Sequence, residues 1–156
     1  MPSAYTILLA GHVLAGSAAL VLGPVSLYIS RRPGFHPAAG TAYLWAIGGL
    51  TASAVGLAAW NVPGLWWLAL LGGTTAAAAW GGRVAGRQPG TRWRPWHLRL
   101  LGGSYVSLVT ALLVVSVGSP LAWVLPTLIG SPLIELAASR AGRPSGMTRA
   151  RPLPAR

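Results

Sequence analysis

The chain has 156 residues with a net charge of +11, and all of its charged side chains are arginines except one acid, Glu135. Hydrophobic residues make up 53% and charged residues 8%, against roughly a quarter charged in ordinary soluble domains, so this composition excludes a water-soluble globule. The lack of Cys, Lys and Asp excludes disulfides, thiolate metal sites and paired-carboxylate hydrolysis, and arginines confined to gaps between apolar runs exclude a nucleic-acid-binding face.

Five apolar segments follow one another along the chain, each near the roughly 20 residues that a membrane-spanning helix needs. They lie at 4–30, 41–60, about 64–82, 100–117 and 121 to about 139. The last is the weakest, because it contains Pro126, Pro132 and Glu135. The predicted fold is therefore all-α, a polytopic membrane bundle of five transmembrane helices. Four spans followed by a re-entrant or interfacial end are the alternative.

The arginines predict the orientation of these spans. They follow the first, third and fifth segments: Arg31, Arg32; Arg83, Arg87, Arg92, Arg94, Arg99; Arg140, Arg143, Arg149, Arg151 and Arg156. With five spans all of them lie on one side of the membrane, which the positive-inside rule makes cytoplasmic. We therefore expect an external N-terminus and a cytoplasmic C-terminus in a bacterial plasma membrane.

The chain divides into two parts. Residues 1–140 are predicted to form the transmembrane bundle, with small residues at every fourth position that allow close helix packing. Residues 141–156 are rich in Arg and Pro and are predicted to be a disordered cytoplasmic tail. The expected partners are the lipid bilayer, anionic headgroups at the arginine-rich face, and a second copy or a larger membrane complex; nucleic acid is not expected.

His12 is an ionisable residue inside the first span, about 10 Å below the outer boundary at 1.5 Å per residue. Such residues are costly in lipid and therefore indicate function. Gly16, one turn further on, leaves room for a flat cofactor or for a neighbouring helix. Two interpretations stay open: a neutral imidazole hydrogen-bonded to another helix, or a group that binds a cofactor or handles protons.

His36 and His97 each lie beside a proline at the expected start of a helix near the cytoplasmic interface. They can face each other, whereas His12 is about 27 Å away, so the three cannot share one metal ion and a zinc enzyme is not supported. A b-type haem held by His36 and His97, with arginines near its propionates, is one hypothesis. The alternative is that each histidine caps or orders a helix start.

Glu135 lies near the cytoplasmic end of the last span, at a depth comparable with Arg99. An unpaired carboxylate is expensive in lipid. We therefore expect a structural Glu135–Arg99 ion pair rather than a proton-carrying acid.

Three separated stretches carry a family resemblance: "GHVLAGSAALVLGP" with His12, "RRPGFHPAAGTAY" with His36 and Tyr43, and "WHLRLLGGSYVSLVTALL" with His97. In this order they resemble the bacterial membrane proteins classed as domain of unknown function 2306, over about residues 8–115. Pro37 stands where that family usually has Arg, and "HLRLL" replaces a longer His-Arg-Arg-Trp-Met-like stretch that Arg99 matches in part. The resemblance implies a multi-helix membrane protein without a settled activity.

These observations predict a non-enzymatic or accessory membrane subunit with no catalytic residues. The alternative is a membrane redox protein that binds haem b or a quinone through His36 and His97, with His12 as a further cofactor-binding candidate. A small transporter is a weaker hypothesis, because the early spans lack a second polar group to coordinate an ion and no two matching halves are present.

Overall fold

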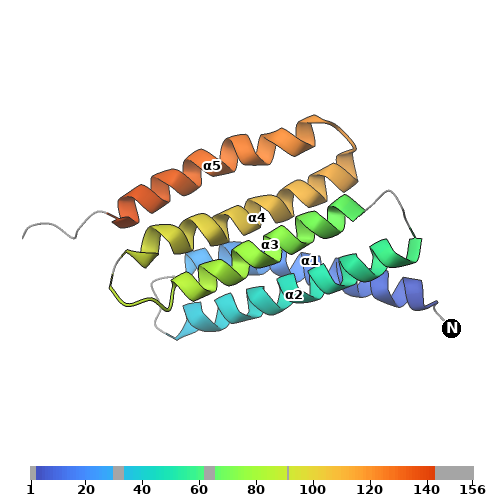
Figure 1. Cartoon of the computed structure of the whole chain (residues 1–156), viewed down its shortest axis with the longest axis horizontal. Helices are drawn as coiled ribbons and strands as arrows, with labels where there is room; N and C mark the ends of the chain where they lie inside the picture. Colours follow the sequence, from blue (N-terminus) through green and yellow to red (C-terminus); the bar gives the residue numbers. More distant parts are fainter. Residues whose placement is uncertain (1–2, 30–33, 62–65, 91, 143–156) are drawn as a thin grey trace, which may run out of the picture.

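The computed structural model describes residues 3–29, 34–61, 66–90 and 92–142. Within these ranges the chain forms five helices and no strand. The helices are α1 (Ala4–Tyr28), α2 (Phe35–Asn61), α3 (Trp66–Ala85), α4 (Trp93–Val117) and α5 (Leu121–Gly142). They run alternately in opposite directions along one long axis (Figure 1). The predicted all-α bundle is confirmed.

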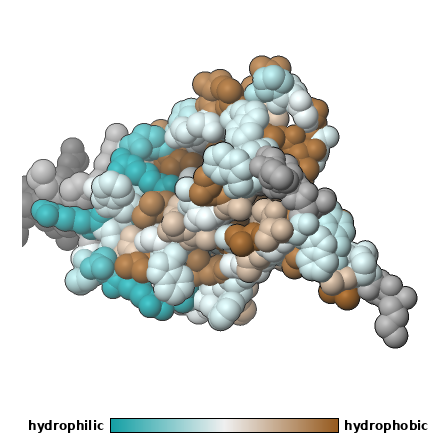
Figure 2. Space-filling view, turned by 45° about the vertical axis from the view of Figure 1, so that its right-hand side comes forward, coloured by the Kyte–Doolittle hydropathy of each residue, from teal (hydrophilic) through white to brown (hydrophobic). Residues whose placement is uncertain are grey.

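Four of the five helices, α1, α2, α4 and α5, are long and apolar enough to cross a membrane. Most of their large apolar side chains face outward: Leu14 is 71% exposed, Val115 67% and Leu128 63%. Figure 2 shows such side chains across the body of the molecule, while hydrophilic residues gather at one end. The chain is an integral, multi-pass membrane protein, because apolar surface of this extent requires lipid around it.

The weakest span is not where hydropathy alone placed it. We expected the last segment to be the doubtful one, yet α5 meets the criteria for a span and α3, although 20 residues long, does not. The reason is composition. Gly, Thr and Trp, with Arg83 in the last turn, lower the mean hydropathy of α3, whereas the Leu and Ile residues of α5 outweigh its two prolines and its acid.

At the arginine-rich end the helices are longer than predicted. α2 begins at Phe35 rather than 41, α4 at Trp93 rather than 100, and α5 continues to Gly142. Pro37 and Pro95 lie in the first turns of α2 and α4, where a missing N–H costs nothing. The helix α5 thus includes the first two residues of the predicted tail; residues 143–156, like Arg31 and Arg32, lie outside the described ranges.

Each helix packs against its neighbours in sequence, and α1 also contacts α4. Small side chains allow the close approach: Gly82 lies against Leu101, and Gly23 lies under the ring of Tyr105. The buried core lies among the first four helices and consists of Ala19, Tyr43, Ile47, Ala79 and Leu108. At the far end of α4, Gly118 with φ +65° forms the left-handed cap that turns the chain into α5.

Candidate functional site

The arginine-rich end brings together two of the three histidines. His36, in the first turn of α2, and His97, in the second turn of α4, have ring centroids 6.2 Å apart at an interplanar angle of 63°. The longer helices at this end produce the pairing, since both histidines lie on them and not in loops.

Hydrogen bonds fix the tautomer of both rings. His36 Nδ1 lies 3.0 Å from the carbonyl oxygen of Ser26, and His97 Nδ1 lies 2.8 Å from that of Gly82. A carbonyl only accepts, so both Nδ1 atoms carry the hydrogen and both Nε2 atoms carry a lone pair. Ser26 is in the last turn of α1 and Gly82 near the end of α3, so each imidazole donates to a carbonyl near a helix C-terminus, and that of Gly82 also accepts from the Gly86 N–H.

Two further contacts strengthen this end. The Trp93 ring meets His97 edge to face at 5.6 Å between centroids. Arg83 Nη1 lies 3.4 Å from the carbonyl oxygen of Pro37, a long contact that joins α3 to the start of α2. Ser26 Oγ is buried and has no hydrogen-bond partner among the described residues.

The spacing of the His36 and His97 rings is compatible with a metal ion between them. Two imidazoles on opposite sides of one ion, with metal–nitrogen bonds of about 2 Å, have centroids about 6 Å apart. Within the described ranges no group of three His, Cys, Asp or Glu side chains is close enough to hold a metal ion. A porphyrin needs, in addition, an open slot between the helices, and the two cavities described below lie elsewhere in the bundle.

The structure also brings Arg99 and Glu135 together, joining α4 to α5. Arg99 Nη2 donates to Glu135 Oε1 at 2.6 Å and Arg99 Nε donates to Oε2 at 3.0 Å, a two-pronged geometry. The guanidinium also lies 5.6 Å from the centre of the Trp96 ring. Both partners are well exposed, at 39% and 59% of their side-chain areas. The carboxylate is thus held as a helix-to-helix contact at the edge of the bundle.

His12 lies apart from the other two histidines and contacts a different helix. Its Nδ1 is 3.0 Å from Ser53 Oγ on α2. Ser53 Oγ in turn lies 2.8 Å from the carbonyl oxygen of Gly49 and 2.9 Å from that of Leu50. The neighbouring helix α2 lies close to Gly16, since a Cβ added there would be 3.3 Å from Leu50 Cδ1, and both residues line the cavity described next.

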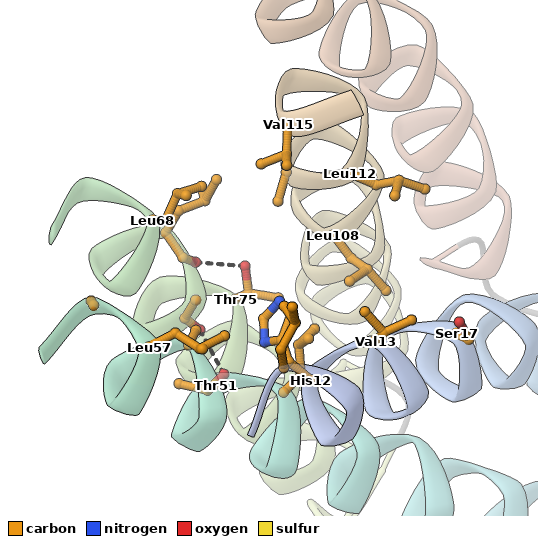
Figure 3. Close-up of a pocket in the computed structure, with 18 of the residues that line it drawn as sticks. His12, Val13, Ser17, Thr51, Leu57, Leu68, Thr75, Leu108, Leu112 and Val115 are labelled. Carbon is orange, nitrogen blue, oxygen red and sulfur yellow. Dashed lines mark hydrogen bonds between the residues drawn. The ribbon is translucent and has the colours of Figure 1, made fainter. Parts of the chain in front are cut away.

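His12 lines the larger of two cavities, with a volume of about 480 Å³ (Figure 3). Its walls come from α1, α2, α3 and α4 and are mainly Leu, Val and Ala: Tyr5, Leu9, His12, Val13, Gly16, Ser17, Leu20, Leu50, Thr51, Ala54, Leu57, Ala58, Leu68, Leu71, Gly72, Thr75, Leu108, Ala111, Leu112 and Val115. A second cavity of about 340 Å³ lies mainly between α4 and α5. The first has the size of a small-molecule site.

The sequence reasoning missed the partners of all three histidines. Of these partners only Ser53 could have been suggested by the sequence, because a hydroxyl inside an apolar span needs a hydrogen-bond partner. Ser26 and Gly82 act through backbone carbonyls, which every residue has, so nothing in their identity marks them.

Comparison with protein-family models, with curated protein sequences and with solved structures finds no match to this chain. The likeness to domain of unknown function 2306 therefore stays a prediction. What the fold and the sites define is a class, a five-helix integral membrane protein with a histidine pair at one end and a histidine-lined cavity nearer the other.

Proposed function

We propose that this chain is a small, non-enzymatic integral membrane protein, an accessory subunit of the bacterial cell membrane. The observation that carries the proposal is that its polar side chains hold helices to one another. His12 bonds Ser53 across α1 and α2, His36 and His97 cap α1 and α3, and the only acid is paired with Arg99. No described constellation of nucleophile, base and acid is left over for catalysis.

The decisive experiment distinguishes the role of Nδ1 from that of Nε2 in each imidazole. Asn offers an amide N–H near the position of Nδ1 but nothing at the position of Nε2. We therefore expect His36→Asn and His97→Asn to keep the stability of the wild type. His36→Leu and His97→Leu lose the hydrogen bond and about 1 kcal/mol each. Reversible unfolding by sodium dodecyl sulfate, followed by far-UV circular dichroism, measures the difference. A proposal of purely structural histidines fails if a folded Asn variant loses a cellular or spectroscopic property of the wild type.

The proposed orientation places the arginine-rich end in the cytoplasm, in contact with anionic headgroups. Six arginines and one glutamate lie near this end of the described chain, which supports it. The chain has no Cys, so a maleimide can react only with a cysteine that is introduced by substitution. A membrane-impermeant maleimide is expected to label Ser3→Cys in intact spheroplasts and Gln88→Cys only after permeabilisation. The reverse labelling pattern contradicts the orientation.

One observation favours a second candidate, a redox protein that binds a b-type haem. Both Nε2 atoms of the pair are free of hydrogen bonds to described residues, and the two ring centroids lie 6.2 Å apart, so the two imidazoles could both bind one iron. His36 and His97 would hold the iron, Arg83 would lie near a propionate, and the group would supply one-electron chemistry. The test is the visible spectrum of protein expressed with ample haem. A Soret band that both Asn variants abolish supports this candidate, and no band in the wild type excludes it.

A further inference from the structure

The cavity beside His12 lies in the half of the bundle away from the arginines. On the arginine side it is closed where α1 meets α4: the ring of Tyr105 covers Gly23, and its hydroxyl donates to the Leu20 carbonyl oxygen at 3.2 Å. Beyond that contact both α1 and α4 contribute lining residues, such as Val13 and Leu112, which are also exposed at the surface of the bundle (Figure 3). The cavity is thus bounded on the arginine side by the Tyr105 contact and has mainly apolar walls.

The ring of His12 lines this cavity, and its surroundings favour one tautomer. Ser53 has a single hydroxyl proton and two carbonyl acceptors in its own helix, Gly49 at 2.8 Å and Leu50 at 2.9 Å, so we assign the proton to these carbonyls and take Ser53 Oγ as the acceptor of His12 Nδ1–H. Ser53 does not line the cavity, whereas His12 does. The half-buried imidazole therefore carries an Nε2 lone pair that makes no hydrogen bond with the described residues.

The other polar groups of the wall do not complement that lone pair. Thr51 donates its proton to the Gly72 carbonyl oxygen at 3.2 Å, and Thr75 donates to that of Leu71 at 2.7 Å. Both bonds are drawn as dashed lines in Figure 3. Tyr5 lies two helical turns from His12 on the same face of α1, further toward the N-terminal end. Ser17 also lines the cavity, but it is exposed and lies more than one helical turn beyond His12 on α1, where its hydroxyl makes no hydrogen bond with the described residues (Figure 3). Apart from Tyr5 toward the N-terminal end, the unmatched half-buried group of the wall is thus the acceptor His12 Nε2.

From this geometry we infer that the cavity binds a lipid-soluble phenol or hydroquinone, whose O–H donates to His12 Nε2 while its apolar body fills the space among the leucines. A quinone that has only carbonyl oxygens offers no donor at this atom, and a lipid acyl chain offers neither donor nor acceptor. The inference goes beyond the proposed function, since a structural subunit needs no ligand, and it places the site at His12 and not at the His36–His97 pair.

The test uses the full-length protein in detergent micelles and a matched pair of probes. Durohydroquinone and its dimethyl ether share the same ring and methyl groups and differ in the O–H donors. Equilibrium dialysis against protein-free micelles measures binding to the protein beyond partition into detergent. A hydrogen bond to an otherwise unpaired acceptor predicts a preference of about tenfold for the hydroquinone. Duroquinone is expected to bind no better than the ether.

Two variants locate the effect. His12→Asn keeps a donor to Ser53 and removes Nε2, so the preference should vanish while the ether still binds. Ala111→Phe fills the cavity from α4 and should abolish the binding of both probes. If His12→Asn fails to fold, the preference in the wild type and its loss in Ala111→Phe decide the question.

Three results overturn the inference: equal binding of the two probes to the wild type, a preference that survives in folded His12→Asn, or no binding above the protein-free micelles. None of them bears on the proposed structural role of His36 and His97, which the Asn and Leu variants of those residues test separately.

Discussion

The two halves of the bundle hold their helices together in different ways. At the arginine-rich end, side chains bond to backbone carbonyls and to each other: His36 to Ser26, His97 to Gly82, Arg99 to Glu135. In the other half, hydrogen bonds also join successive helices, His12 to Ser53, Thr51 to Gly72 and Thr75 to Ser107, but α1 and α4 separate around a cavity of about 480 Å³. The bonds of this second region surround an open space between α1 and α4, and that space sets it apart from the first.

The difference shows what a histidine can contribute in each setting. In both regions Nδ1 ties two helices together, so the histidine stabilises the fold wherever it lies. What differs is the surroundings of Nε2. At the arginine-rich end a second imidazole lies 6.2 Å away between ring centroids, while His12 lines a cavity whose walls are mainly Leu, Val and Ala. The same hydrogen-bonding role therefore leaves two different kinds of site.

The largest expected effect comes from breaking the close packing beside His97. A Cβ added to Gly82 would lie 2.7 Å from Leu101 Cγ and 3.2 Å from the Leu101 backbone nitrogen, so rotating a side chain does not relieve the overlap. Gly82→Leu should cost about 3 kcal/mol in the free energy of unfolding. Gly73→Leu on the same helix is the control, since nothing lies within 4 Å of its Cβ position. Equal losses in both variants, measured by unfolding in detergent, would show that the α3–α4 packing is wrong.

The buried hydrogen bond between Tyr43 and Ser104 lies between the two regions. Removing one partner should cost more free energy of unfolding than removing the other. Ser104 Oγ donates to the Leu101 carbonyl oxygen at 2.7 Å, so the Tyr43 hydroxyl donates to Ser104 Oγ at 3.0 Å. Ser104→Ala leaves a buried phenol without an acceptor and should cost about 2 kcal/mol. Tyr43→Phe removes only the donor and should cost about 0.6 kcal/mol. Unfolding of the double variant sharpens the result: in the Tyr43→Phe background, Ser104→Ala should cost much less.

A smaller effect is expected at the floor of the cavity. Tyr105→Phe keeps the ring over Gly23 and removes only the hydroxyl that donates to the Leu20 carbonyl oxygen. The loss should be about 0.6 kcal/mol, the usual size of a hydrogen bond between membrane helices. Thermal unfolding measures it, and a loss as large as that of Gly82→Leu would mean that the hydroxyl and not the ring holds α1 to α4.

The smallest effect should come from the exposed ion pair. Glu135→Gln keeps the shape of the side chain and removes its charge. We expect only a slight loss of stability, because the other contacts at the arginine-rich end still hold the helices together. The double reversal Arg99→Glu with Glu135→Arg should recover stability lost in either single reversal. A double-mutant cycle on the unfolding midpoints gives the coupling, and no recovery would show that the two side chains do not interact in the folded protein.

The helices themselves were predictable because apolar length is a strong signal in a chain with so few charges. The errors have physical causes. The second and fourth apolar spans were placed at 41 and 100, later than the helices begin, although the prolines near His36 and His97 correctly indicated helix starts there. The rank of α3 and α5 was misjudged, because too much weight was given to Pro126, Pro132 and Glu135 in α5 and too little to the Gly, Thr and Trp residues that lower the hydropathy of α3.

The sites were predictable only in part. Similar depth and a neighbouring proline suggested that His36 and His97 can meet, and a buried charge suggested a partner for Glu135; the structure places both pairs together. The cavity beside His12 could not be predicted from the sequence, because it depends on how α1 and α4 diverge past Tyr105. The tautomers were equally hidden, since they depend on backbone carbonyls brought near by tertiary packing.

The peripheral position of α5 has a consequence for biogenesis. Figure 1 shows α5 on the outside of the bundle, where its closest neighbour is α4. Every residue that lines the His12 cavity lies between Tyr5 and Val115, before α5 begins at Leu121. During synthesis the cavity can therefore be assembled in the membrane before the ribosome has released the last helix, and α5 then docks on a surface that is already complete.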